Sequence, residues 1–418
     1  MYQERLKIDW LTVGLWLFIM LFGWMNIYAA TYDGGETSLF DFSTYHCKQL
    51  VWMAAASLMA ILILFSEPRF FSNAAYPIYA LVLVLLVVTL FIATVTKGGK
   101  SWIDLGPFKL QPSEFAKFAT ALALSKYMSA IDVEWKNMRT KLAAAIIVLI
   151  PMGLVFLQHD TGSALVFLGF VLPLFREGLS GVILVVGLVA VALFVLALLV
   201  NKYILLGVLV LIALFYLFVW LSKRTAKDYW RTVAVLACCA VFIFSVDFVF
   251  TKVLEPHQRE RIEVLLGKTE DLRGSGYNVH QSKIAIGSGG FFGKGYLKGT
   301  ITKADFVPEQ HTDFIFCTVG EEWGWLGSSV LVVAFVVLLV RLINMAERQR
   351  STFSRFYGYS VASILFVHLF VNVGMVLGLV PVIGIPLPFF SYGGSSLLAF
   401  TILLFVFIRL DATKNQLY

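Results

Sequence analysis

The segment His280–Phe316 reads HQSKIAIGSGGFFGKGYLKGTITKADFVPEQHTDFIF, and the segment Thr269–Asn278 before it reads TEDLRGSGYN. Both belong to a polar, glycine-rich stretch, Glu255–Asp313, that lies between long apolar runs. Polar and ionisable residues are expensive inside a membrane and are kept there mainly for function. We therefore expect this stretch to lie outside the hydrocarbon and to serve chemistry or partner binding.

The composition indicates an integral membrane protein. Of the 418 residues, 59% are hydrophobic and 14% are charged, and the mean hydropathy is +0.83. Soluble domains carry about 25% charged residues, and a soluble core could not bury this many long apolar runs. The net charge of +7 is explained by basic residues flanking membrane spans, so we expect membrane lipids and no nucleic acid as partners.

Twelve apolar runs approach the length needed to cross a bilayer core of about 30 Å. The sequence therefore predicts a single all-α polytopic membrane domain, residues 1–418, with about 12 transmembrane helices, of which the sixth is short. The predicted spans are Trp10–Ala30, Leu50–Phe65, Pro77–Val95, Pro112–Ser129, Leu142–Leu157, Thr161–Phe175, Gly181–Val200, Tyr203–Leu221, Thr232–Phe250, Phe314–Val340, Phe356–Leu379 and Ser391–Ile408.

The distribution of Lys and Arg predicts the orientation. With the N-terminus inside, seventeen basic residues fall in cytoplasmic segments and five fall in the short outer loops. Cytoplasmic loops of membrane proteins carry this excess, so both termini are expected in the cytoplasm. The long loop, residues 251–312, is then extracytoplasmic, away from ATP.

Three charged residues next to or inside predicted spans have two interpretations each. Glu114 and Lys117 lie three residues apart at the start of a helix and share a face. They either neutralise each other or face an outward-open cavity where Lys117 meets an anionic substrate. Asp160 either serves as an N-cap or lines the same site.

The glycine run Gly287–Gly295, GSGGFFGKG, resembles a phosphate-binding loop but fails the Walker A pattern at two positions, Ser288 and Gly295. We expect no nucleotide. The glycines either allow tight turns against the membrane surface or bring backbone N–H groups to a phosphate.

Five motifs, taken in order along the chain, resemble the SEDS family (shape, elongation, division and sporulation), and the elongation member more than its division counterpart. They are QPSEFAK (111–117), QHDTGSAL (158–165), GSGYNVHQSKIAIGSGG with the following GKG and GT (274–300), PEQHTDFIF with GEEWG (308–324) and PLPFFSYGGSS (386–396). The resemblance implies a peptidoglycan glycosyltransferase that polymerises lipid II at the outer leaflet of the bacterial cytoplasmic membrane during cell elongation. It also implies a class B penicillin-binding protein, a transpeptidase, as partner.

The resemblance also implies site residues. The family's essential aspartate corresponds to Asp271, although Leu272 stands where the family has Pro. Glu114 and Lys117 correspond to residues that line a central cavity. The other positions that match motifs around this cavity are Asp160, Gln281, Ser282, His311, Asp313, Ser391, Gly393 and Gly394.

The family has ten spans, so the sequence departs from it by two. The excess falls at residues 201–251, which predict an inserted transmembrane hairpin with a basic cytoplasmic turn. Two added spans keep the sidedness of everything that follows.

The predicted chemistry joins a sugar hydroxyl to an anomeric carbon whose leaving group is a lipid diphosphate. It needs a base, for which Asp271 is the candidate, and cations or N–H donors for the departing diphosphate. Lys117 or a divalent cation, Mg or Mn, is expected to take that charge. Two alternatives stay open: a lipid II flippase, which needs polar groups through the full membrane depth, and a scaffold without activity.

Overall fold

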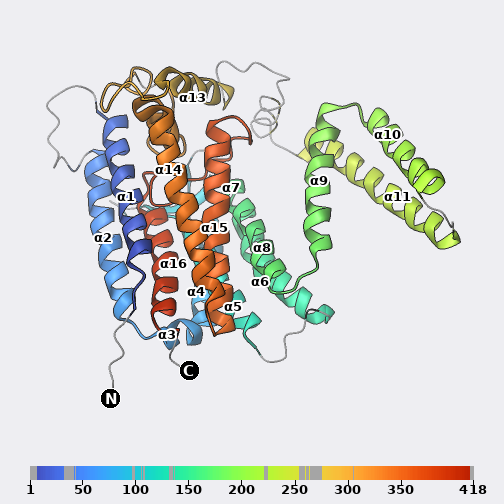
Figure 1. Ribbon diagram of the computed structural model, residues 1–418, viewed down its shortest axis with the longest axis horizontal. Coiled ribbons are helices and arrows are strands. Elements are labelled where there is room, and N and C mark those ends of the chain that lie inside the picture. The colour runs from blue at the N-terminus through green and yellow to red at the C-terminus, as the bar shows by residue number, and fades with distance from the viewer. Residues whose placement is uncertain are drawn as a thin grey trace. The chain divides into compact units, whose positions relative to one another are not determined.

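The computed structural model describes residues 7–32, 42, 44–96, 99–104, 106, 109–130, 135, 137–220, 225–253, 259, 263, 275–304 and 306–414. Its described part is almost entirely helical (Figure 1). The chain forms two compact units, one of Met1–Gly178 with Tyr277–Tyr418 and one of Leu179–Gly276. Each unit is described by itself.

The larger unit is a helical bundle with helices of very different length. Its long helices run roughly alongside one another, and α13 lies across one end of the bundle (Figure 1). The helices are α1 (Trp10–Ala30), α2 (Tyr45–Phe65), α3 (Pro68–Asn73), α4 (Ala75–Ile92), α5 (Pro112–Met128), α6 (Met138–Leu157), α7 (Thr161–Val166), the 3-10 turn η1 (Phe167–Phe170), α8 (Val171–Arg176), α13 (Ser275–Gly289), α14 (Ile315–Glu347), α15 (Thr352–Val376) and α16 (Gly394–Ala412).

The core of this unit is built around α5, α15 and α16, which are the most enclosed helices. α16 packs against α2, α5 and α15, and α14 packs against α1 and α15. A small antiparallel sheet precedes α5, with strands β1 (Thr94–Thr96), β2 (Gly99–Asp104) and β3 (Lys109–Leu110) in that order. The sequence did not predict this sheet, nor α13, which lies inside the stretch interpreted as a loop.

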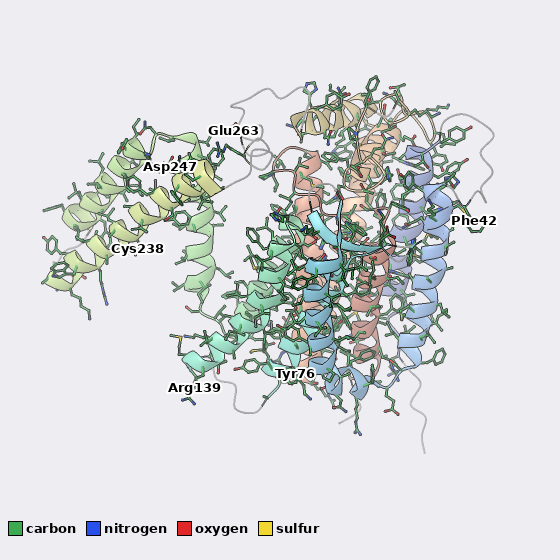
Figure 2. All side chains as sticks on the ribbon, turned by 180° about the vertical axis from the view of Figure 1, so that it is seen from behind. Phe42, Tyr76, Arg139, Cys238, Asp247 and Glu263 are labelled. Atoms are coloured by element: carbon green, nitrogen blue, oxygen red, sulfur yellow. The ribbon has the colours of Figure 1, made fainter. Side chains whose placement is uncertain are left out.

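The smaller unit contains α9 (Gly181–Leu199), α10 (Lys202–Phe215) and α11 (Ala226–Phe248), with π-helical turns η2 (Tyr216–Trp220) and η3 (Val249–Val253). The predicted hairpin, residues 201–251, corresponds to α10 and α11. Asp247, on α11 (Figure 2), had no assigned partner in the sequence, and Lys202 Nζ lies 2.8 Å from its Oδ2. This ion pair joins the two helices and lets both charges enter an apolar hairpin.

Ten helices of the described ranges are long and apolar enough to cross a membrane. They agree with ten of the twelve predicted spans. The other two are shorter: α5 has 17 residues, and Thr161–Arg176 is divided between α7, η1 and α8. The polytopic helical fold is confirmed, and the count of twelve remains a prediction.

Basic residues that the sequence assigned to the cytoplasm meet acidic ones at the end of the bundle where α1 begins and α16 ends. Arg341 Nη2 lies 2.6 Å from Asp9 Oδ2, and Arg348 pairs with both Asp9 and Asp411. Burial alone would raise the pKa of Asp9, but hydrogen bonds from Arg341 and Thr12 outweigh it and lower that pKa. Arg139, near the start of α6, lies at the same end as Tyr76 of α4 (Figure 2).

At the opposite end, α14 contains a break at Gly324, whose φ is 65° and ψ is −159°. The break exposes backbone groups on both sides of it, and the glycine-rich segment after α13 satisfies them. The amides of Lys294 and Gly295 donate to the carbonyls of Glu321 (3.0 Å) and Glu322 (2.9 Å). In the other direction, the amides of Trp325 and Leu326 donate to the carbonyls of Gly290 (2.9 Å) and Phe291 (3.1 Å).

These four hydrogen bonds explain the glycines of GSGGFFGKG. A Cβ on Gly289 would collide with the carbonyl of Gly320, and a Cβ on Gly293 would collide with that of Glu322. Gly293 also has a φ of 79°, which side chains rarely adopt. Gly289 and Gly293 therefore serve close packing against the backbone of α14, a role that the sequence did not predict, and the positive φ of Gly290, Gly293 and Gly295 is compatible with the expected tight turns.

Gly289→Ala should destabilise the protein, whereas Gly287→Ala on the same helix should not. The new methyl group at position 289 meets backbone that cannot rotate away, and overpacking of this kind costs about 1–3 kcal/mol. Position 287 has no atom within 4 Å of the added Cβ, so there alanine should add up to ~1 kcal/mol through reduced backbone entropy. Thermal unfolding of the two purified variants checks this, and equal midpoints would contradict the packing account.

Candidate active site

The segment after α13 is held in place by the buried carboxylate of Glu321, in the second turn of α14. Its Oε1 accepts from Lys294 Nζ (2.7 Å) and from the amides of Thr300 (2.8 Å) and Ile301 (2.9 Å). Its Oε2 accepts from the amide and hydroxyl of Thr302 at 2.9 and 2.8 Å. The GKG and GT elements of the sequence thus wrap around one side chain, which holds the loop against the membrane end of α14.

The neighbouring carboxylate of Glu322 is different. It is 1% exposed, and neither of its oxygens has a hydrogen-bond partner within geometric limits among the described residues. The backbone amides of Leu297 and Gly299 act on it electrostatically without reaching that geometry. Glu321 and Glu322 therefore have separate roles, although they are adjacent in sequence.

Glu114 and Lys117 lie in the first two turns of α5 and are both buried, at 2% and 1% exposure. Lys117 Nζ donates to Glu114 Oε2 at 2.8 Å and lies 2.9 Å from His368 Nε2 of α15. The ring of Phe400 lies 5.0 Å from the same ammonium, close enough for a cation–π interaction. Glu114 Oε1 has no hydrogen-bond partner among the described residues, so one buried acceptor remains beside the ion pair.

Asp160 caps α7 and also contacts the start of α5. Its Oδ1 accepts from the Ser163 amide at 3.0 Å, as expected of an N-cap. Its Oδ2 accepts from Gln111 Nε2 at 3.0 Å and from Ser113 Oγ at 3.1 Å. The two interpretations of Asp160 are therefore compatible, because one oxygen caps a helix while the other orients the QPSEFAK motif.

The Pro386–Ser396 segment, PLPFFSYGGSS, connects several of the predicted site residues. Ser391 Oγ donates to the Thr312 carbonyl (2.7 Å) and accepts from the Leu387 amide (2.9 Å). The Tyr392 amide donates to the carbonyl of His311 at 3.0 Å.

The imidazole of His311 stacks on the ring of Tyr45, with centroids 4.3 Å apart. The amide of Gly393 donates to Gln49 Oε1 at 3.3 Å, and a Cβ on Gly394 would collide with the indole of Trp52. The two glycines therefore let this segment approach α2 closely.

Three further predicted residues lie around α15. Ser282 Oγ donates to the carbonyls of Val279 (2.9 Å) and Val376 (2.8 Å) and is fully buried, whereas Gln281 is half-buried. The Asp313 carbonyl accepts from Asn372 Nδ2 at 2.9 Å. Ser282 thus ties α13 to the end of α15, and Asn372 ties the residue just before α14 to the last turns of α15.

The predicted catalytic residue Asp271 and its neighbour Glu270 lie outside the described residues. In the part of the chain that the structure describes, no three His, Cys, Asp or Glu side chains lie close enough to hold a metal ion. The described residues thus supply no ligand set for the expected divalent cation.

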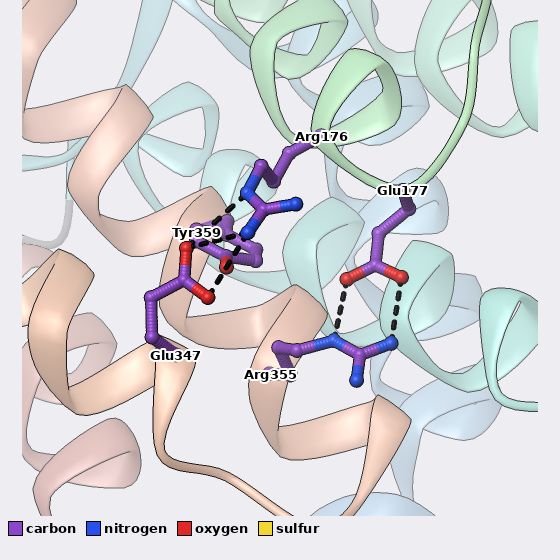
Figure 3. A pocket seen from close by; sticks show the side chains of 5 residues that line it. All are labelled: Arg176, Glu177, Glu347, Arg355 and Tyr359. Atoms are coloured by element: carbon purple, nitrogen blue, oxygen red, sulfur yellow. Dashed lines mark hydrogen bonds and ion pairs between the residues drawn. The ribbon is translucent and has the colours of Figure 1, made fainter.

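A polar cavity in the described part of the chain contains none of the predicted site residues. It is lined by Arg176, Glu177, Glu347, Arg355 and Tyr359 (Figure 3). Arg176 pairs with Glu347 at 2.8 Å and Arg355 pairs with Glu177 at 2.7 Å. These two ion pairs join the end of α8 to α14 and α15. Within each pair the positive and negative charges balance, so the charged lining of the cavity is explained by helix packing.

His368 and Asn372 are the residues that the sequence interpretation missed. They lie one helical turn apart in an otherwise apolar run, VASILFVHLFVNVGMV (361–376), and both are fully buried. A pair of polar residues at that spacing inside a span was the available signal. The described geometry is therefore a polar cluster on α5, α15 and the 386–396 segment.

Comparison with known proteins assigns the class. The family model described as cell cycle protein, that of FtsW, RodA and SpoVE, matches residues 9–203 and 208–416, and the chain belongs to this family. The family resemblance predicted from the motifs is thus confirmed, and the chain is a multi-pass membrane protein.

Individual relatives carry more specific names. The chain is 34% identical over 332 residues, 79% of this chain and 76% of the relative, to the peptidoglycan glycosyltransferase MrdB of Escherichia coli K12. It is 32% identical over 378 residues to the peptidoglycan glycosyltransferase RodA of Treponema pallidum, covering 85% of this chain and 87% of the relative.

Two solved structures share the fold. One, described as structural coordination of polymerization and crosslinking by a peptidoglycan synthase complex, aligns with a TM-score of 0.71 and 28% identity, covering 99% of this chain and 100% of that chain. The rod shape determining protein RodA of Thermus thermophilus aligns with a TM-score of 0.63 and 25% identity over 99% of both chains.

The buried pair can be tested without leaving one charge uncompensated. Lys117→Ala alone would bury a lone Glu114 carboxylate, which typically costs about 3–5 kcal/mol and confuses folding with function. The double variant Glu114→Gln with Lys117→Met removes both charges at similar volume, and such replacements are often neutral for stability.

If the pair only satisfies itself, the double variant should unfold at the wild-type temperature and polymerise at the wild-type rate. If Lys117 meets the substrate, it should fold normally and lose at least about 99% of the rate, by analogy with loss of a preorganised electrostatic donor. We expect the second result. Glycan synthesis measured beside thermal unfolding separates the two.

Proposed function

We propose that this protein is a peptidoglycan glycosyltransferase that polymerises lipid II into glycan strands during cell elongation. Two relatives that this chain matches over most of their length are named peptidoglycan glycosyltransferases, which supports the activity. The observation that carries the site is the buried cluster of Glu114, Lys117 and His368 at the start of α5, next to the 386–396 segment.

The reaction forms one bond and breaks one. A hydroxyl oxygen of the acceptor sugar attacks the anomeric carbon of the donor, and the bond from that carbon to the diphosphate oxygen breaks. The diphosphate leaves with the electron pair on its lipid carrier, and the hydroxyl proton passes to a base. Asp271 is the proposed base, and a single carboxylate without a sugar-ester intermediate gives inversion.

Lys117 is the proposed electrostatic partner of the departing diphosphate. A preorganised cation in a water-poor site stabilises developing negative charge far better than one in bulk water. Lys117 is already desolvated and held by two hydrogen bonds. Because Lys117 is 1% exposed, substrate binding must open a path to it, and Glu114 is its hydrogen-bonded partner until then.

We place the reaction at the outer leaflet of the bacterial cytoplasmic membrane, with both termini in the cytoplasm. The excess of basic residues at the end of the bundle near Asp9 and Asp411 supports this orientation. A class B penicillin-binding protein is the proposed partner, because one structural neighbour is a peptidoglycan synthase complex that couples polymerization to crosslinking.

A lipid II flippase is the second candidate. Translocation needs polar groups along the whole depth of the bundle. Among the buried Asp, Glu, Lys and Arg residues of the described ranges, Glu114, Lys117, Glu321 and Glu322 lie near the starts of α5 and α14. Asp9 and Asp411 lie at the opposite end, where Arg341 and Arg348 pair with them. None of these buried charges lies between the two ends, which favours an active site at one end over a path through the bundle.

A divalent cation, Mg or Mn, stays part of the proposal as a carrier of diphosphate charge. Chelation with EDTA followed by addition of each metal tests it. Recovery of glycan synthesis with one metal would support the cation, and full activity in EDTA would contradict it.

The proposed base is tested by paired variants of adjacent carboxylates. Asp271→Asn should abolish glycan synthesis, since removal of a general base costs about 10²- to 10⁴-fold in rate. Glu270→Gln should stay largely active, because only Asp271 matches the family's aspartate. Co-purification with the penicillin-binding partner controls for folding.

Long glycans from Asp271→Asn would refute the assignment of the base. An inactive Glu270→Gln beside an active Asp271→Asn would transfer the role to Glu270.

A further inference from the structure

His368 lies in α15, eight residues before its end, with an exposure of 0%. A titratable side chain inside a membrane-spanning helix is costly and is retained where it has a partner and a use. The proposed reaction does not yet give His368 a role of its own. Its two ring nitrogens contact different parts of the cluster, and this geometry defines what the ring does.

The hydrogen bonds fix the tautomer of His368. Nδ1 lies 3.0 Å from the carbonyl oxygen of Pro386. A carbonyl oxygen only accepts, so Nδ1 carries the hydrogen. In the neutral ring Nε2 is then an acceptor, and it faces Lys117 Nζ at 2.9 Å. The imidazole ring is therefore hydrogen-bonded to the Pro386 carbonyl on one side and to the Lys117 ammonium on the other, so the place of the carbonyl sets the place of the acceptor that Lys117 meets.

The segment that holds His368 is itself held by the next turn of α15. Asn372 Nδ2 donates to the carbonyl of Ile385 at 2.8 Å and to that of Asp313 at 2.9 Å. Ile385 and Pro386 are thus fixed at two consecutive carbonyls by two side chains one turn apart. Phe400 of α16 packs edge-on against the imidazole, with centroids 4.7 Å apart.

We propose that His368 is a positioning residue for Lys117. The Nε2 atom of His368 accepts from the Lys117 ammonium and orients that group toward the diphosphate of the substrate. The inference rests on the proposed function, because it gives Lys117 its task in glycosyl transfer. Glu114 supplies the countercharge from the same helix, three residues away. His368 supplies the second anchor from another helix, so the direction of the ammonium is defined by α5 and α15 together.

Two substitutions separate the two hydrogen bonds. The amide of Gln reaches the place of Nε2, so His368→Gln keeps an oxygen acceptor for Lys117. The amide of Asn reaches only the place of Nδ1, so His368→Asn keeps the donor to the Pro386 carbonyl and loses the acceptor. A positioning role requires the Lys117 side of the ring, whereas a purely structural tie requires the Pro386 side.

The experiment measures kcat and KM for lipid II polymerisation by the purified full-length variants, with thermal unfolding of each. We expect His368→Asn to lower kcat about ten- to hundredfold, the range for a hydrogen bond to a charged group, with KM and the unfolding midpoint nearly unchanged. His368→Gln should keep most of kcat. Ser363→Ala is the matched control, because it removes another buried hydrogen bond of α15, to the Gly169 carbonyl, and should leave kcat unchanged.

Equal kcat values for the Asn and Gln variants, or the reverse order, would overturn the inference. If His368→Asn fails to fold, His368→Leu replaces it, since leucine fills similar volume and offers no acceptor. A wild-type protein that makes no glycan would refute the proposed function instead, so the two failures are distinguishable.

Discussion

The break in α14 at Gly324 is the constraint on which the end of the bundle around α13 depends. Inside a bilayer, backbone groups released by a helix break must be satisfied by protein, because lipid offers no partner. The segment Gly289–Gly295 supplies four hydrogen bonds to that break. It can do so only because glycines allow backbone to approach backbone closely. The carboxylate of Glu321 then fixes the following loop through Lys294 and residues 300–302.

The polar cluster at the start of α5 is likewise held together by hydrogen bonds between segments that are distant along the chain. Several polar side chains there each join two segments: Asp160 joins α7 to α5, Ser391 joins the 386–396 segment to Thr312, and Asn372 joins Ile385 to Asp313. Buried networks in a low dielectric are rigid when satisfied and costly when not. Glu114 Oε1 and Asn372 Oδ1 have no hydrogen-bond partner among the described residues, and the first of them leaves one acceptor beside Lys117.

Much of this arrangement could be predicted from the sequence, for physical reasons that differ between elements. Apolar runs such as Trp10–Ala30 and the helix start at Pro112 were predicted nearly to the residue, because hydrophobic length and proline act locally. α13 was missed, since its sequence SGYNVHQSKIAIGSG has a polar, glycine-rich composition, and its contact with α14, between Ile286 and Gly320, joins residues that are distant along the chain. The motifs identified the family, but not that Glu321 rather than Glu322 binds the loop. His368 was missed because its partners, Lys117 and Pro386, are distant along the chain.

We expect this chain alone to join lipid-linked disaccharides, with the polar cluster at one end of its bundle as the site. The direct measurement incubates the purified wild-type protein in detergent with lipid II and no other polymerase, and separates the products by gel electrophoresis. The account predicts a ladder of glycan strands. Unchanged lipid II, from folded protein that moves lipid II across the membrane of sealed vesicles, would contradict it and favour the flippase.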